Sequence, residues 1–489
     1  MFEKKVVQVE DRWSVYYGGT GEMPARALEL LAEGLSCYIN EYTPEFVRAG
    51  QKSVVGNSIL IGVGNDNPLI VQLLGEQKIP EQGYRLCVKD SPWQPGKQVA
   101  VIVGGDASGL LYGCVDFIYQ YLAKADYDLT QQSGLDFLRI LDATCGNERV
   151  MHLPEIDETD APKLSKRGLW TWGHPIYNYR GYLDNMLKLK MNQAIIWNDE
   201  PPVNGQAFVE YAHRNCVEVI WGFSWAWGVD IDISADGAME HWKDVVISEY
   251  RDHYADMGGD GVYFQTFTET TEDMKDGLVI AEEAVKWVNY ISDALLKLYP
   301  HLKIQFGLHA TSVCHRMDVI AKTDPRVDII WEDCGAFPYA YSAGKIDGYE
   351  ETQAFTDEII HHRTSGEYGA VLKGMMNLDW TKFEYKTGPF MLGCADKGFR
   401  DGRTATQRRF WHFRQSDWLV NGDYCRRIVK QLADGCNGQA SVTFLVEDGM
   451  FEEALWYVVV LGGEMLWNSE RSIREIMTVA ARRTDVVFA

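Results

Sequence analysis

The chain has 489 residues, of which 46% are hydrophobic and 24% charged, and 47 basic against 70 acidic residues give a formal net charge of −23 at pH 7. This length suits two or three domains, or a barrel with one additional domain. The acidic balance argues against a nucleic-acid partner, because such a partner needs a cationic face that displaces counterions.

Targeting and metal-binding signals are absent from the sequence. No stretch of about 18 uncharged apolar residues occurs, and the opening MFEKKVVQVE lacks an apolar leader. We therefore expect no membrane partner and a cytoplasmic location, or a secreted or periplasmic one if a leader has been removed. The ten cysteines form no CxxC pair and no Cys/His set of zinc spacing, so we expect reduced thiols, no metal and no cofactor. A homo-oligomer is compatible with these features.

Residues 1–150 are predicted to form a small α/β domain. Segments 53–64 and 83–90 have strand character, 68–77 looks helical, and 98–125 has the pattern of strand, glycine turn and helix. The turn GGDASGLLYG has neither GxGxxG spacing nor a GK[ST] signature, which argues against a phosphate-binding loop.

Residues 151–166 are predicted to form an exposed linker, because the stretch is polar and contains prolines. From residue 167 to residue 489, apolar strand-like segments alternate regularly with amphipathic helical ones. Eight strands, each followed by a helical stretch, predict a (β/α)8 TIM barrel, so the expected fold class is α/β. The predicted strands are 167–175, 193–202, 217–228, 261–270, 303–313, 327–338, 368–380 and 439–449.

Polar and aromatic residues follow these strands, at the end where (β/α) barrels carry their active sites. We expect substrate contacts from nine of them, because carboxylates, amides and imidazoles bind hydroxyls and tryptophans stack on sugar faces. The nine are Trp172, His174, Asn198, Asp199, Trp225, Gln265, His309, Trp380 and Glu447. Trp227 and Trp331 are two further candidate sugar platforms.

Paired carboxylates beside aromatic side chains are what cleavage of a glycosidic bond requires. One acid protonates the departing oxygen, and a second activates water, attacks, or stabilises positive charge at the anomeric carbon. Glu269 is the first candidate for the acid, because it follows an apolar strand and partial burial favours retention of its proton. The alternative is that Glu269 has no catalytic role and only interacts favourably with the dipole at the N-terminus of the next helix. Glu332, Asp333 and Asp379 compete for the second role.

The N-terminal segments carry a family resemblance. ILIGVGNDNPLI, EQGYRLCVKD and VAVIVGGDASGLLYGCVDFI resemble the small α/β domain that precedes the barrel in β-hexosaminidases and α-glucuronidases. In those families this domain is a scaffold without catalytic residues. The resemblance covers about a quarter of the chain, and it implies that a sugar-processing barrel follows.

The barrel resembles each family only in part. GGDGVYFQTFTE is similar to the α-glucuronidase segment that ends in the general acid, which places the acid at Glu269, and WEDCGAFP and NLDW lie where that family has its other carboxylates. No SEGQPG-like segment follows. Hexosaminidases have adjacent Asp-Glu after the fourth strand, which FTETTED lacks; the adjacent acids after strands are Asp199-Glu200, Glu332-Asp333 and Glu447-Asp448. A substrate-assisted mechanism would have to use one of these pairs.

The expected function is thus a glycoside hydrolase with a carbohydrate substrate, either a hexosaminide or a uronide. Two alternatives stay open. The first is a non-catalytic carbohydrate-binding protein on a degenerate TIM barrel, in which the acids only bind hydroxyls. The second is a metal-dependent sugar isomerase or lyase, which would lose activity on chelation.

Overall fold

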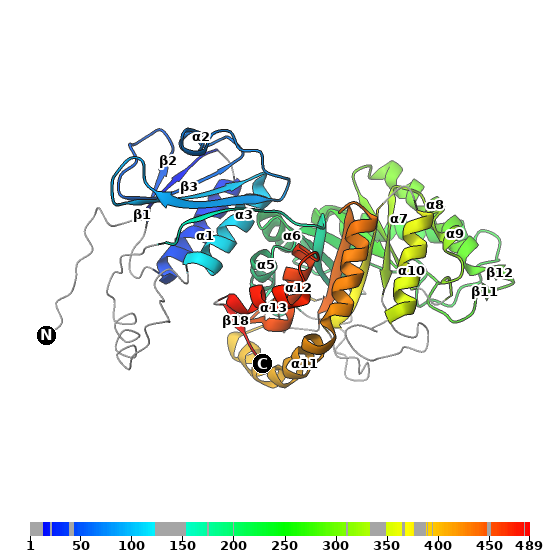
Figure 1. The fold of residues 1–489 in the computed structure, drawn as a ribbon. Coiled ribbons are helices and arrows are strands. Elements are labelled where there is room, and N and C mark those ends of the chain that lie inside the picture. Colours follow the sequence, from blue (N-terminus) through cyan, green and yellow to red (C-terminus); the bar gives the residue numbers. More distant parts are fainter. Residues whose placement is uncertain are drawn as a thin grey trace. The chain divides into compact units, whose positions relative to one another are not determined.

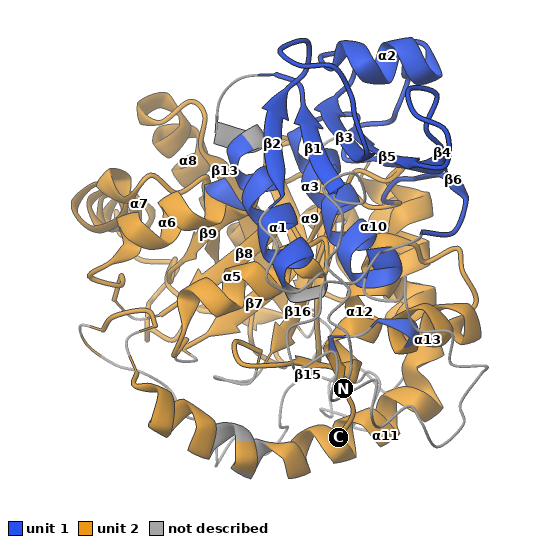
Figure 2. Cartoon of the chain, turned by 90° about the vertical axis from the view of Figure 1, so that its left-hand side faces the viewer, with its two compact units in different colours: residues 1–162, 214–216, 482–485 blue, residues 163–213, 217–481, 486–489 orange. Residues whose placement is uncertain are grey.

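The computed structural model describes residues 13–19, 22–38, 44–122, 153–173, 176–198, 200–309, 312–332, 349–363, 367–375, 388, 390–393, 395–446, 451–483 and 485–489. Of residues 22–24, 37–38, 403–404 and 406–407 it describes the backbone alone. The chain forms two compact units, which Figure 2 shows in different colours. Unit 1 comprises residues 1–162, 214–216 and 482–485, and unit 2 comprises residues 163–213, 217–481 and 486–489.

Unit 1 is a six-stranded sheet with helices on both faces (Figure 1). The strand order is β2-β1-β3-β5-β4-β6, and β4 runs antiparallel to both of its neighbours. The strands are β1 (Trp13–Tyr17), β2 (Glu45–Arg48), β3 (Asn57–Val63), β4 (Tyr84–Asp90), β5 (Gln98–Gly104) and β6 (Ile156–Asp160). The helices are α1 (Glu22–Tyr38), α2 (Pro68–Leu74) and α3 (Ala107–Asp116), which continues as a π-helical turn over Phe117–Tyr121.

The glycine-rich turn before α3 serves packing. Asp106 caps the helix, because its Oδ1 accepts the Gly109 N–H at 2.8 Å. A Cβ at Gly109 would lie 2.0 Å from the Gly83 carbonyl oxygen, so only glycine allows the helix to approach the sheet this closely.

The predicted linker 151–166 contains a strand of this sheet. Residues 156–160 form β6, which pairs with β4 from Tyr84↔Asp160 to Val88↔Ile156. A strand at the edge of a sheet pairs on one side only and can be polar on both faces, which explains why IDETD has the composition of an exposed connection.

Unit 2 confirms the predicted barrel. Eight parallel strands close in the order β10-β13-β14-β15-β16-β7-β8-β9. Seven lie within segments predicted to be strands, and β7 begins one residue before its predicted segment. The eight strands are β7 (Lys166–Trp172), β8 (Gln193–Trp197), β9 (Glu218–Gly222), β10 (Gly261–Phe264), β13 (Lys303–His309), β14 (Val327–Glu332), β15 (Tyr368–Met375) and β16 (Ala440–Val446).

Helices surround these strands (Figure 1). They are α5 (Tyr179–Lys188), α6 (Gly205–Arg214), α7 (Ala238–Glu249), α8 (Ile280–Leu298), α9 (Met317–Ile320), α10 (Tyr349–His362), α11 (Lys397–Gly435), α12 (Tyr457–Trp467) and α13 (Ile473–Arg482). Two short ladders, β11 (Met274–Lys275) with β12 (Leu278–Val279) and β17 (Leu455–Trp456) with β18 (Val486–Val487), complete unit 2. Among the described helices, none has the length and apolar character needed to cross a bilayer.

Burial on both faces explains why the barrel strands are nearly continuous apolar runs: β8 and β15 are buried at every position. Inward side chains from several strands fill the interior, among them Trp170, Ile195, Tyr263, Ile330 and Val371. The next inward residue along a strand lies two positions later, at the C-terminal mouth of the barrel.

The N-terminal rim of the barrel is held by an ion cluster. Glu218 on β9 accepts hydrogen bonds from Lys166 on β7 and from Lys303 on β13. The cluster joins strands that are not adjacent, at the end of the barrel opposite the mouth. Residues at that end of a TIM barrel stabilise the fold and take no part in catalysis.

Candidate active site

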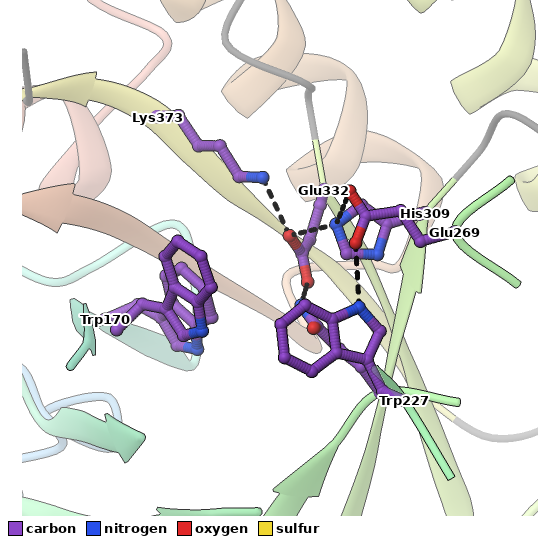
Figure 3. A pocket seen from close by; sticks show the side chains of 8 residues that line it. Trp170, Trp227, Glu269, His309, Glu332 and Lys373 are labelled. Atoms are coloured by element: carbon purple, nitrogen blue, oxygen red, sulfur yellow. Dashed lines mark hydrogen bonds and ion pairs between the residues drawn. The ribbon is translucent and has the colours of Figure 1, made fainter. Parts of the chain in front are cut away.

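A cavity of about 290 Å³ lies at the mouth of the barrel. Its lining comes from the C-terminal parts of β7, β13, β14 and β15 and from the loops after β9 and β10. Figure 3 shows these side chains gathered around the cavity. The lining residues are Trp170, Trp172, Trp227, Gln265, Glu269, His309, Glu332 and Lys373.

Glu332, the last residue of β14, is the buried anion of this cavity, with a side chain that is 0% exposed. Its Oε1 accepts hydrogen bonds from the Tyr263 hydroxyl, at 2.6 Å, and from the Gln265 amide. Its Oε2 lies 3.1 Å from His309 Nε2 and 2.9 Å from Lys373 Nζ. These four groups come from three different strand ends, so the barrel assembles the network.

The partners of Glu332 determine its charge. Burial alone would raise its pKa, but the charges of His309 and Lys373, together with hydrogen bonds from His309 and Tyr263, outweigh burial and hold the pKa well below its ordinary value. Burial and the neighbouring Glu332 charge raise the pKa of the Tyr263 hydroxyl well above its ordinary value. Glu332 is therefore an anion and Tyr263 a neutral donor at neutral pH.

Glu269 is the more accessible carboxylate, with 36% of its side chain exposed. It lies in the loop after β10, where its Oε2 accepts the Trp227 indole N–H at 2.7 Å. Its Oε1 lies 3.8 Å from His309 Nε2, the nitrogen that contacts Glu332. The sum of the two distances from this nitrogen limits the separation of Glu269 Oε1 and Glu332 Oε2 to 6.9 Å.

Tryptophans form the walls of the cavity. Trp172 and Trp227 meet edge to face with ring centroids 5.9 Å apart, and Trp170 packs in the same way on Tyr263 at 5.7 Å. Indole faces beside carboxylates and an imidazole suit a sugar, whose C–H faces stack on aromatic rings while its hydroxyls hydrogen-bond.

The structure brings together six of the residues proposed from the sequence: Trp172, Trp227, Gln265, Glu269, His309 and Glu332. Three others lie elsewhere. Asn198 is buried after β8 and is not among the residues that line the cavity. Trp225 is also buried, stacked on Phe264 with centroids 3.7 Å apart, so it packs in the core and is no sugar platform. Trp331 is likewise buried, with its ring centroid 5.2 Å from that of Phe355, and it does not line the cavity. His174, Asp199, Asp333, Asp379, Trp380 and Glu447 lie outside the described residues.

Three residues of the site were not proposed from the sequence: Trp170, Tyr263 and Lys373. Period-two alternation could have indicated Lys373, because Val371 faces the barrel interior and the side chain two positions later faces the same way. The pairing of β15 with β16 also shifts register between Leu372 and Met375, an irregularity that re-aims side chains near barrel rims.

No group of three or more His, Cys, Asp or Glu side chains suitable for a metal ion occurs within the described part of the chain. In the described cavity Lys373 and His309 are cationic partners of Glu332. The arrangement can hold one carboxylate ionised and present a second, accessible one to a ligand.

Comparisons with known proteins identify the fold. No family model matches the chain, and no curated protein matches it. Among solved structures, the chain is similar to a β-hexosaminidase from Streptomyces plicatus, with 11% identity and a TM-score of 0.53 over 97% of this chain and 92% of that one. It is similar to a β-N-acetylhexosaminidase from Streptomyces coelicolor A3(2), with 12% identity and a TM-score of 0.52 over 98% and 94%.

A β-N-acetylhexosaminidase from Bacteroides fragilis NCTC 9343 has 13% identity and a TM-score of 0.51 over 94% of this chain and 87% of that one. At these identities the likeness establishes a shared architecture, an N-terminal α/β domain and a TIM barrel.

Proposed function

We propose that the chain is a glycoside hydrolase, with Glu269 as general acid and Glu332 as the ionised partner that stabilises positive charge at the anomeric carbon. The observation that carries the proposal is the pairing of two carboxylates in opposite environments, joined through His309 within one aromatic cavity. Glu332 is buried and held ionised by its partners, whereas Glu269 is accessible to a ligand, and two carboxylates in such different surroundings can take different roles.

The proposed step begins when the bound sugar stacks against the tryptophan walls. Glu269 transfers its proton to the glycosidic oxygen as the bond to the anomeric carbon breaks, and the oxygen leaves with the electron pair. Glu332 stays ionised, because His309 and Lys373 remain beside it. Water then adds to the anomeric carbon and gives a proton to the Glu269 carboxylate, which restores the acid.

For the substrate we propose a hexosaminide, because the three similar solved structures are named as hexosaminidases. A uronide is the second candidate, and Lys373 at the cavity supports it, since an ammonium group pairs with a carboxylate. Asp333, Asp379 and Glu447 stay as proposed site residues.

The test is turnover of a panel of aryl glycosides that includes N-acetylhexosaminides and glucuronides. Glu269→Gln should lower kcat/KM at least about 100-fold without unfolding the protein, because general acid catalysis contributes at least that factor. The matched control is Glu272→Gln, which makes the same change at an exposed acid of the same loop. Equal activity of Glu269→Gln and the control would overturn the proposal, and saturable sugar binding without turnover would indicate a binding protein.

A further inference from the structure

Trp227 contributes more to the site than an aromatic wall. Its indole N–H donates to Glu269 Oε2 at 2.7 Å, and Figure 3 shows the indole nitrogen directed at that carboxylate. An indole nitrogen is a donor only. When Glu269 is protonated, the arrangement favours the proton on Oε1, because the carbonyl oxygen of a carboxylic acid accepts a hydrogen bond more strongly than the hydroxyl oxygen and Oε2 is the atom that accepts the indole N–H.

His309 does not draw that proton away through Nε2. This nitrogen lies 3.1 Å from Glu332 Oε2, and the ionised Glu332 can only accept a hydrogen bond. Nε2 must then carry a hydrogen directed at Glu332. Although Glu269 Oε1 is 3.8 Å from the same nitrogen, the nitrogen is no proton acceptor for Glu269.

The loop after β9 fixes the place of Trp227. Residues Ala226 and Gly228, on either side of it, have φ values of +67° and +73°, and the Ser224 hydroxyl donates to the Trp227 carbonyl oxygen at 2.7 Å. A left-handed conformation is unfavourable for alanine and persists only where surrounding contacts impose it. The indole also packs edge to face on Trp197, with centroids 5.9 Å apart.

We propose that Trp227 is a positioning residue, which locks the Glu269 carboxyl so that its acidic proton, on Oε1, faces the departing glycosidic oxygen. The inference rests on the proposed function. In the step, the Oε1–H bond breaks as the proton moves to the glycosidic oxygen, and the electron pair of the C–O bond leaves with that oxygen. The carboxylate that remains keeps the Trp227 N–H as a donor.

The experiment compares two aryl glycosides of the same sugar, one with phenol and one with 2,4-dinitrophenol as leaving group. Phenolate is a poor leaving group and needs protonation, whereas dinitrophenolate departs without it. Trp227→Phe removes the N–H and keeps an aromatic ring. We expect kcat/KM for the phenyl glycoside to fall about 10-fold or more, a part of the whole general-acid effect, and kcat/KM for the dinitrophenyl glycoside to change less than about 3-fold.

The matched control is Trp197→Phe, which alters the ring packed on Trp227 and leaves the donor to Glu269 in place. It should affect both glycosides alike. In the double variant with Glu269→Gln, Trp227→Phe should cause no further fall in kcat/KM for the phenyl glycoside, because the acidic proton that Trp227 positions is already absent.

Two results separate this inference from the proposed function. If Glu269→Gln shows the leaving-group dependence but Trp227→Phe slows both glycosides equally, the positioning role is overturned and the acid role stands. If Glu269→Gln itself shows no leaving-group dependence, or the wild type cleaves neither glycoside, the acid role fails and the inference fails with it.

Discussion

Lys373 Nζ lies 2.9 Å from Glu332 Oε2 in the interior of the barrel, and the two side chains are only 9% and 0% exposed. Removing one member of a buried ion pair is more costly than removing both, because the remaining charge loses its counter-charge in a medium of low dielectric. The pair therefore links the stability of the barrel to the chemistry of its mouth.

Glu332→Gln should lower the free energy of unfolding by about 3 kcal/mol or more, because it removes the negative charge that faces Lys373 and His309. The double variant with Lys373→Met should recover part of this loss. Urea unfolding at pH 7 measures both. As a control, Lys397→Met breaks an exposed pair with Asp401 and should cost less than about 1 kcal/mol. Equal losses in Glu332→Gln and this control would contradict the prediction.

A second prediction concerns pH. His213 Nε2 lies 2.8 Å from Asp260 Oδ2, and the hydrogen bond to Asp260 raises the pKa of His213 above its ordinary value of 6.5, against the opposing effect of burial. The stabilisation is then complete below pH 6.5 and is lost as pH rises through the folded-state pKa. Because the side chain is 46% exposed, solvent screening limits the effect to less than about 1 kcal/mol.

Urea unfolding of the wild type between pH 6 and pH 8.5 should show this loss, and His213→Asn should reduce it. The Val219 N–H bond to Asp260 is independent of the imidazole, so the local backbone should stay in place in the variant. Identical pH dependence of the two proteins would refute the assignment.

The position of Gly307 on β13 has no room for a side chain. A Cβ there would lie 2.2 Å from the Tyr263 hydroxyl oxygen, the donor to Glu332. Gly307→Ala should therefore destabilise the barrel by about 1–3 kcal/mol through overpacking and lower turnover as well. Gly402→Ala in α11 is the control, because its added Cβ meets nothing within 4 Å and a helical alanine is neutral or stabilising. Thermal unfolding of both variants provides the comparison.

Trp172 tests the aromatic walls. Trp172→Ala removes a face of the cavity without changing either Glu269 or Glu332, so the loss should be mainly in substrate binding. We expect KM for a cleaved glycoside to rise about 5-fold or more while kcat changes less, the pattern of a contact made equally in the ground and transition states. A selective fall in kcat would mean that Trp172 acts in the chemical step.

The architecture could be predicted from the sequence because burial on both faces gives each barrel strand a long apolar run, and eight such runs leave few other closed arrangements. The mouth was less predictable. Trp225 and Trp227 follow the same strand and have the same type of side chain, yet one packs on Phe264 and the other faces Glu269. The left-handed backbone of Ala226 between them changes the direction of the chain, and the alternation of the sequence does not encode this turn.

Tertiary contacts also decided the role of Glu332. In the sequence it is one of two adjacent acids, and nothing local distinguishes it from a solvated loop residue. The lysine and histidine that hold it ionised come from β15 and β13, which lie far from it along the chain. The charge of Glu332 therefore depends on the pairing of β14 with β13 and β15, which brings His309 and Lys373 beside it.

The two carboxylates of the cavity are attached to the barrel in different ways, since Glu332 ends a strand whereas Glu269 lies in a loop. A laboratory that wished to retarget the protein could exchange the segments after β9 and β10 as a cassette, taking the proton donor and its tryptophan together. Glu332 would stay unchanged at the end of β14, so that every variant of the exchanged loops could be screened on the same barrel.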